Sequence, residues 1–184
     1  MREMKEKPVS TNYIHRGRII NLREDSVLLP DGRPAKREIV EHRGAVAVLG
    51  ILPDGKLLFV KQYRRPLDQV LIEVPAGIPE KGEKGLDAAR RELLEETGYL
   101  AANLKAVGRA ASSPGYSNEI IQYFLACDLT LKEQDLDEDE LVEPLVLSLS
   151  QAWDKIRSGE IFDGKTIALL ALYERDDQFK AEKC

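Results

Sequence analysis

The chain has 184 residues, which suits one domain and is long enough to bury a sizeable core. Hydrophobic residues at 43%, charged residues at 32% and a net charge of −5 describe an acidic globular protein and argue against a nucleic-acid partner. No apolar run approaches the roughly 20 residues that cross a bilayer, and the N-terminus has no apolar signal core, so we expect a cytoplasmic protein without a membrane partner.

The first 45 residues predict an antiparallel β extension. Polar and apolar residues alternate over residues 13–21, 26–29 and 35–41, without a helical period. Asp31 and Gly32 between them are typical of a hairpin turn. We therefore expect two or three strands in residues 1–45, followed by the main domain in residues 46–184.

The next segments predict buried strands. Residues 44–52 form a nearly continuous apolar run, as expected for a strand that is covered on both faces. A Pro-Asp-Gly turn leads into a hairpin partner at residues 56–64, and residues 69–74 form a further short strand.

A helix with an unusual concentration of carboxylates follows. Glu92 lies one helical turn from both Glu95 and Glu96, while Leu86, Ala89 and Leu93 can anchor the adjoining face. Like charges at this spacing, just before the Gly98 stop where the helix dipole disfavours anions, are destabilising. A hard divalent cation resolves this conflict, although a solvated acidic face is the alternative interpretation.

The C-terminal half predicts more strands and then two helices. Strands are expected at residues 104–110, 120–128 and 141–147, the last at a sheet edge because it contains Pro144. Ser148 and Gln151 are spaced as a capping box for a helix that ends at Gly159, and residues 165–175 form a final helix. This order predicts an α/β fold, a mixed sheet between helices.

The residues around the acidic helix resemble the Nudix box. Gly77 is followed after five residues by Glu83, after seven more by Arg91-Glu92-Leu93, then by Glu95-Glu96 and Gly98. Tyr99 replaces the usual aliphatic residue. The chain is therefore similar to Nudix hydrolases, which cleave nucleoside diphosphates linked to another moiety with Mg²⁺ or Mn²⁺, and the resemblance implies an α/β/α sandwich.

Features outside the box resemble the ADP-ribose pyrophosphatase subgroup. Pro114 lies sixteen residues after Gly98, where this subgroup has a proline, and the segments at residues 61–66 and 73–77 are also similar. A surface turn is the alternative interpretation of the Ser-Pro-Gly sequence, as an edge-strand charge is for Arg64. The resemblance implies a nucleotide-sugar substrate, bound by Arg37, Glu38, Arg64, Ser113, Pro114, Gly115 and Glu119.

The resemblance also implies the roles of the box residues. Glu92 and Glu96 would hold the metal together with the backbone carbonyl of Ala76, and Glu95 would be a further ligand or would hold Arg91. Gly77, Glu83, Arg91 and Gly98 would be structural. The two histidines and two cysteines show no zinc-ligand or nucleophile pattern, and we expect Cys127 to be a small buried hydrophobe.

The general base is expected outside the box, on the acidic segment before the last strand. In the resembling proteins it is a glutamate on a flexible loop, which here implicates Glu140 or Glu138 as base, and Glu140 as a further metal ligand. A merely solvated loop is the alternative, in which case Glu95 becomes the first candidate.

Three further hypotheses complete the interpretation. Apolar residues outside the box-bearing core, within residues 13–41, favour a homodimer. A Nudix hydrolase of another nucleotide sugar, such as GDP-mannose, is the nearest alternative. A non-catalytic nucleotide sensor is the alternative from another class, disfavoured because all three box carboxylates are present.

Overall fold

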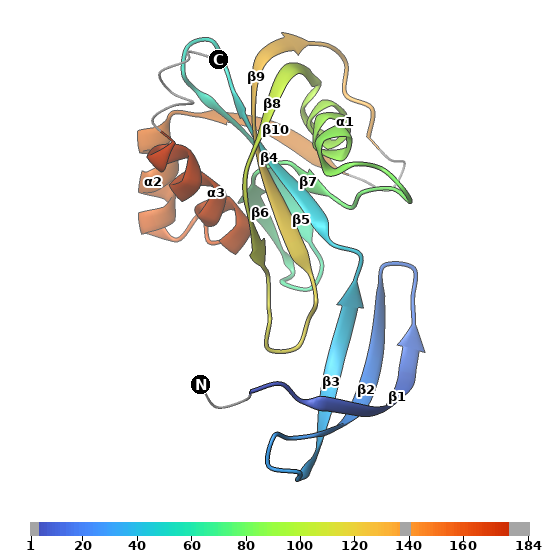
Figure 1. The fold of residues 1–184 in the computed structure, drawn as a ribbon. Helices are drawn as coiled ribbons and strands as arrows, with labels where there is room; N and C mark the ends of the chain where they lie inside the picture. Colours follow the sequence, from blue (N-terminus) through green and yellow to red (C-terminus); the bar gives the residue numbers. More distant parts are fainter. Residues whose placement is uncertain (1–3, 137–140, 177–184) are drawn as a thin grey trace. The chain divides into compact units, whose positions relative to one another are not determined.

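The computed structural model describes residues 4–136 and 141–176, which form two compact units. The first unit contains residues 1–44 and 111–120, and the second contains residues 45–110 and 121–184. Figure 1 shows a three-stranded sheet in the first unit and a larger sheet with three helices in the second. Among the described residues, no helix has the length and apolar character that a membrane span requires.

The first unit is built on an antiparallel meander of β1 (Lys7–Arg16), β2 (Ile20–Leu28) and β3 (Pro34–His42). The turn predicted at Asp31 and Gly32 is present, with Gly32 at φ 83° and its amide donating to the Leu29 carbonyl. The single strand expected over residues 13–21 is wrong. The chain turns between Gly17 and Ile20, whose amide and carbonyl are hydrogen-bonded, so that stretch belongs to two strands.

The second unit contains a seven-stranded mixed sheet. Five strands follow the order β10-β5-β4-β9-β8, with β6 paired to β5 and β7 paired to β4. The β4 and β9 strands are parallel, whereas β4–β5, β5–β6 and β5–β10 are antiparallel. The bounds are β4 (Ala45–Ile51), β5 (Leu57–Arg64), β6 (Gln69–Glu73), β7 (Ala76–Gly77), β8 (Tyr99–Ala111), β9 (Ile120–Leu131) and β10 (Val142–Leu147).

Both faces of this sheet are covered, which confirms the predicted sandwich. Alternate residues of β4 point to opposite faces, so Ala47 and Leu49 belong to one core while Val46 and Val48 belong to another. The first core includes residues of α2 (Leu149–Ser158) and α3 (Gly164–Arg175), and the second includes residues of α1 (Gly85–Thr97). Figure 1 accordingly shows α1 on one side of the sheet and the other two helices on the opposite side.

Several local predictions are confirmed by the capping and edge geometry. Ser148 and Gln151 form a reciprocal capping box at the start of α2, and Gly159 ends that helix in the left-handed conformation. The strand that contains Pro144 lies at the sheet edge and pairs only with β5 among the described strands. Cys127 is buried in the core.

Candidate active site

The acidic helix α1 presents two different faces. Its buried residues are Ala88, Ala89, Glu92, Leu93, Glu96 and Thr97. Leu86, expected to anchor the helix, is instead 38% exposed, because it lies in the first turn, and Ala88 takes the buried position. Glu92 and Glu96 are thus 9% and 3% exposed although both carry carboxylates. Buried carboxylates are costly unless they are paired, so their partners define the site.

Gly77, on the short strand β7, leaves space for the carboxyl group of Glu92 beside the backbone. A Cβ atom added to Gly77 would lie 2.0 Å from the Glu92 carboxyl carbon, so the Glu92 side chain would have to leave this position. The box glycine at this position is therefore required by close approach of a carboxylate to the backbone. The neighbouring residue is engaged in the same way, because the Ala76 amide donates to Glu96 Oε2 at 3.2 Å.

Arg91 contacts three of the four box carboxylates, those of Glu83, Glu92 and Glu95. Its Nε and Nη2 each donate to Glu83 at 3.0 Å, and its Nη1 lies 2.8 Å from Glu95 Oε2 and 2.9 Å from Glu92 Oε1. The hydrogen bond with Arg91 holds the pKa of Glu83 below its usual value, and the same bond raises the pKa of Arg91. Arg91 therefore orients carboxylates, as expected for a structural residue of the motif.

The C-terminal end of α1 is fastened by the segment that follows β9. Gly98 adopts φ 75° and its amide donates to Leu94, while its carbonyl accepts from the Lys132 amide at 2.7 Å. The Gln134 side chain donates to the Glu96 carbonyl at 2.6 Å. Carbonyls that a helix end leaves without internal partners are thus satisfied, which fixes the turn that carries Glu95 and Glu96.

No ready-made metal cluster of three acidic, histidine or cysteine side chains occurs in the described residues. The box carboxylates are brought to one end of the sheet, but Glu92 and Glu95 contact Arg91 and Glu96 contacts a backbone amide. The metal assignment of Glu92, Glu95, Glu96 and the Ala76 carbonyl stays a prediction. Glu138 and Glu140, the base candidates, lie outside the described residues.

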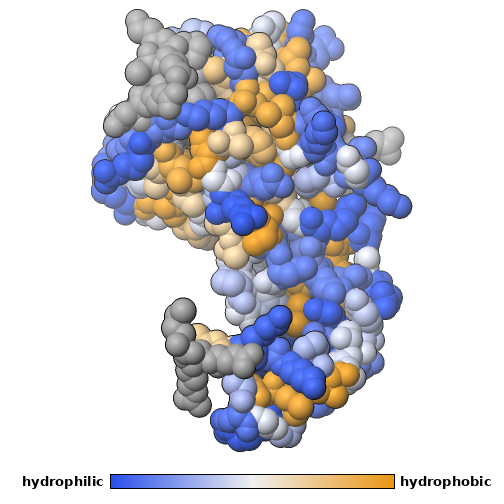
Figure 2. Space-filling view, in the orientation of Figure 1, coloured by the Kyte–Doolittle hydropathy of each residue, from blue (hydrophilic) through white to orange (hydrophobic). Residues whose placement is uncertain are grey.

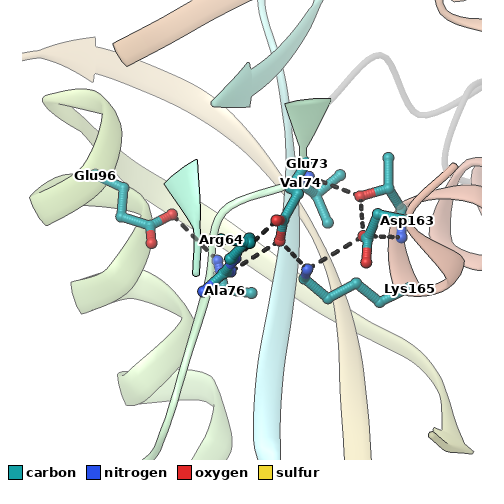
Figure 3. A network of polar contacts seen from close by, with 8 residues as sticks. Arg64, Glu73, Val74, Ala76, Glu96, Asp163 and Lys165 are labelled. Carbon is teal, nitrogen blue, oxygen red and sulfur yellow. Dashed lines mark hydrogen bonds and ion pairs between the residues drawn. The ribbon is translucent and has the colours of Figure 1, made fainter. Parts of the chain in front are cut away.

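Arg64 lies at the end of β5, in a network that sequence reasoning missed. Its Nε and Nη2 both donate to the Glu73 carboxylate at 2.8 Å, and Glu73 is 1% exposed (Figure 3). This hydrogen bond raises the pKa of Arg64. A charged residue inside the apolar run of residues 70–74 was the available signal, because a buried carboxylate requires a cationic partner.

The other predicted substrate residues belong to the first unit. Arg37 is bonded to Glu6, and Glu38 is exposed on the same strand, β3. Pro114 and Gly115 form an exposed turn after Ser113, whose carbonyl accepts from the amides of residues 116 and 117. An open pocket of about 220 Å³ lies in this unit, lined by Ile20, Val40, His42, Ser112, Ser113, Tyr116, Ser117 and Glu119. Ser113 and Glu119 thus share a pocket, whereas Arg37, Glu38, Pro114 and Gly115 do not line it.

Comparison with known families agrees with the box geometry. A NUDIX domain model matches residues 41–170, and a model of the nucleoside diphosphate sugar hydrolase N-terminal domain matches residues 6–40. The chain belongs to the Nudix hydrolase family. The domain match of this Nudix hydrolase includes β5, β7 and the whole of α1, the elements that carry Arg64 and the helix and glycine of the box.

Two relatives match this Nudix hydrolase over nearly its full length, and a third matches part of it. The chain is 41% identical to an ADP-ribose pyrophosphatase of Bacillus subtilis, over all of both chains. It is 42% identical to a methanol dehydrogenase activator of Bacillus methanolicus, over 95% of this chain and 96% of the relative. A GDP-mannose pyrophosphatase of Yersinia enterocolitica is 35% identical over 73% of this chain and 75% of its own length.

A solved structure of an ADP compounds hydrolase superposes with a TM-score of 0.83 and 20% identity, covering 99% of this chain and 98% of that one. At this level of identity the superposition supports the fold alone. It confirms the mixed α/β architecture that the sequence predicts.

Proposed function

We propose that this Nudix hydrolase cleaves the pyrophosphate bond of ADP-ribose, or of a closely related ADP-sugar, to AMP and a sugar phosphate. The observation that carries the proposal is the enclosure of two buried carboxylates, Glu92 and Glu96, against the backbone of Gly77 and Ala76. The full-length relative at 41% identity is named an ADP-ribose pyrophosphatase, which supports the substrate class.

The donor set fits a divalent metal. Glu92, Glu96 and the Ala76 carbonyl offer oxygen atoms, which Mg²⁺ and Mn²⁺ prefer, and the buried carboxylates lie where α1 meets β7. Glu95 pairs with Arg91, so we assign it the role of orienting Arg91 in preference to that of a metal ligand. The bound cation would neutralise phosphate charge and polarise a phosphoryl oxygen.

Residues of the chain would supply the general base and the contacts to phosphate. A water oxygen attacks one phosphorus of the pyrophosphate, the bond from that phosphorus to the bridging oxygen breaks, and the water proton passes to a base. We assign the base to Glu140 or Glu138, with Glu140 also able to serve as a metal ligand. Arg64 would contact phosphate oxygens, for which a guanidinium is geometrically suited.

A comparison of substrates tests the proposal. We expect kcat/KM for ADP-ribose to exceed that for GDP-mannose and for NADH, measured side by side with saturating Mg²⁺. GDP-mannose as the best substrate would favour the second candidate function, which the relative from Yersinia enterocolitica supports. Binding of ADP-ribose without turnover would instead indicate a nucleotide sensor.

We further propose a homodimer formed through the first unit. Apolar side chains on β1 and beside the turn into β2 are exposed: Val9, Tyr13, Ile14, Ile19 and Ile20. Figure 2 shows apolar patches on an otherwise largely hydrophilic surface. Such surface favours contact with a second copy. Light scattering at micromolar concentration should give twice the chain mass, and a monomer mass would contradict the proposal. The cytoplasmic location and the absence of a nucleic-acid partner stay predictions from composition.

A further inference from the structure

The helix α3 reaches the strand that precedes the box through a buried polar network. Thr166, which is 0% exposed, accepts a hydrogen bond from the Val74 amide at 2.9 Å through its hydroxyl. Lys165 donates to Glu73, the residue before Val74 (Figure 3). Two adjacent residues at the start of α3 therefore hold Glu73, the last residue of β6, and Val74, which follows it.

Asp163 completes the network and fixes its geometry. Its Oδ2 accepts from the Thr166 amide at 3.0 Å and from the Thr166 hydroxyl at 2.6 Å, as an N-cap of α3. The same oxygen lies 3.1 Å from Lys165 Nζ. The Thr166 hydroxyl thus donates to Asp163 and accepts from Val74, so its single proton and one lone pair are both assigned.

The charges in this network balance. Glu73 and Asp163 face Lys165 and Arg64, two carboxylates with two cations, and Glu73 is bonded to both cations. A buried carboxylate with this arrangement needs no further cation. The Glu73 carboxylate therefore holds the surrounding side chains in position. Among these, the Arg64 guanidinium is the one that faces the box.

The network ends at the proposed metal ligands. Val74 is followed after one residue by Ala76, whose amide donates to Glu96, and Figure 3 shows this contact beside Arg64. Because the peptide chain from Glu73 to Ala76 is short, anchoring residues 73 and 74 restricts the position of the Ala76 carbonyl. The Pro75 carbonyl also accepts from the Val48 amide of β4, which restricts the segment from the other side.

We propose that Lys165 and Thr166 are positioning residues of the pyrophosphatase site. Lys165, through Glu73, orients Arg64, and Thr166, through Val74, places the Ala76 carbonyl beside Glu96. This inference rests on the proposed function, and it adds residues from a helix on the opposite face of the sheet from α1. A residue that orients a ligand or its neighbour typically changes metal affinity or activity by about 10- to 100-fold when it is replaced.

The test uses isosteric replacements. Thr166→Val keeps the shape but removes the acceptor for Val74, so we expect the dissociation constant of Mn²⁺ alone, measured by electron paramagnetic resonance, to rise about tenfold. Thr166→Ser keeps the hydroxyl and should restore Mn²⁺ binding. Lys165→Met should lower kcat/KM for ADP-ribose about tenfold through KM, because Arg64 loses its fixed orientation, and Lys165→Arg should recover part of it.

Lys105→Met is the matched control. Lys105 pairs with Asp176 at 2.9 Å, at the opposite end of α3 from Lys165 and Thr166, so it tethers the same helix at another point. We expect this variant to lose thermal stability while keeping Mn²⁺ binding and kcat/KM. If Thr166→Val and Lys165→Met behave like Lys105→Met at a temperature where circular dichroism shows all three folded, the positioning role is wrong.

The two proposals fail in different ways. Wild-type protein that does not hydrolyse ADP-ribose contradicts the proposed function, while a Mn²⁺ affinity that falls in Thr166→Val and returns in Thr166→Ser still supports the positioning role. Should Thr166→Val fail to fold, Lys165→Met and Lys165→Arg decide, because a KM that does not differ among them and the wild type overturns the inference.

Discussion

The second unit contains two arginine-centred clusters whose charges differ. Arg91 faces three carboxylates, those of Glu83, Glu92 and Glu95, whereas Arg64 and Lys165 face two, those of Glu73 and Asp163. The first cluster has excess negative charge and the second is balanced. Only the first therefore has a charge that a divalent cation would neutralise. The first cluster includes the proposed metal ligand Glu92, whereas the carboxylates of Glu73 and Asp163 hold neighbouring side chains in position.

The largest expected effect concerns the general base, which we assign to neither cluster. Glu95 lies 2.8 Å from the Arg91 guanidinium, and we assign its carboxylate to orienting Arg91. Glu140→Gln should therefore lower kcat by about two to four powers of ten with little change in substrate binding. Steady-state kinetics at saturating Mg²⁺ measures this effect.

Related variants locate the base. A larger loss in Glu138→Gln would assign the role to Glu138, and partial rescue of Glu140→Gln by high Mg²⁺ would indicate a metal ligand. If kcat stays normal in both single variants and in the double variant, while Glu95→Gln loses it, the division between the clusters is wrong.

The next effect tests the excess charge of the Arg91 cluster and its neighbour Glu96. Glu96→Gln should lower kcat about 100- to 1,000-fold, because a cation that stabilises the transition state by several kcal/mol would be held less well. Without metal, the same variant should not be less stable, since like-charge repulsion on α1 is relieved. Glu133→Gln, an exposed glutamate beyond the box, is the control and should retain activity. Undiminished hydrolysis in Glu96→Gln would remove the metal assignment.

Loss of the Glu73 carboxylate from the balanced cluster should lower the stability of the protein. Glu73→Gln removes the charged partner of Arg64 and leaves Lys165 with Asp163, and we expect a loss of about 3 kcal/mol in the free energy of unfolding, measured with urea. The value lies at the low end for buried ion pairs because the Arg64 side chain is 37% exposed and can be hydrated. Glu143→Gln breaks an exposed pair with Lys61 and should leave the transition unchanged. Equal effects of the two variants would show that burial does not distinguish these pairs.

The smallest effect is a pH dependence of the same cluster. Burial by itself would raise the pKa of Glu73, but the Arg64 and Lys165 contacts outweigh it and the pKa lies below the ordinary 4.5. The stabilisation is then complete above the unfolded-state pKa and is lost as the pH falls through the folded-state pKa. Below about pH 4.5, wild-type stability should fall more steeply than that of Glu73→Gln, in urea titrations at each pH. Parallel curves would contradict this assignment.

The first cluster could be predicted from the sequence far better than the second. The physical reason is that its residues are close together in the sequence. Glu83, Arg91, Glu92 and Glu95 lie within one helix and its preceding loop, so helical periodicity places them together. The contact of Thr166 with Val74 joins residues 92 positions apart. No local pattern specifies such a pair, although the isolated charge of Glu73 within an apolar strand signals that a partner exists.

The fold shows the same limit. The buried β4, the edge position of β10 and the caps of α2 follow from apolar runs, Pro144 and the Ser148–Gln151 spacing. The bounds of β1 and β2 do not, because residues 13–21 have apolar residues on both sides of the turn, a pattern that predicts one segment. Strand order and the choice of face for each helix depend on packing across the sheet, which periodicity does not record.

The close approach of Glu92 to Gly77 has a consequence for how this enzyme can change. Replacing glycine by any other amino acid introduces a Cβ atom, and at position 77 that atom would occupy the space of the Glu92 carboxyl group, which would have to move. Every replacement at position 77 therefore acts on a proposed metal ligand. Gly115, with nothing within 4 Å of a Cβ atom added there, carries no such constraint. Divergence toward other nucleotide sugars is therefore expected to accumulate in loops such as residues 112–119, while the glycine of the box stays constant.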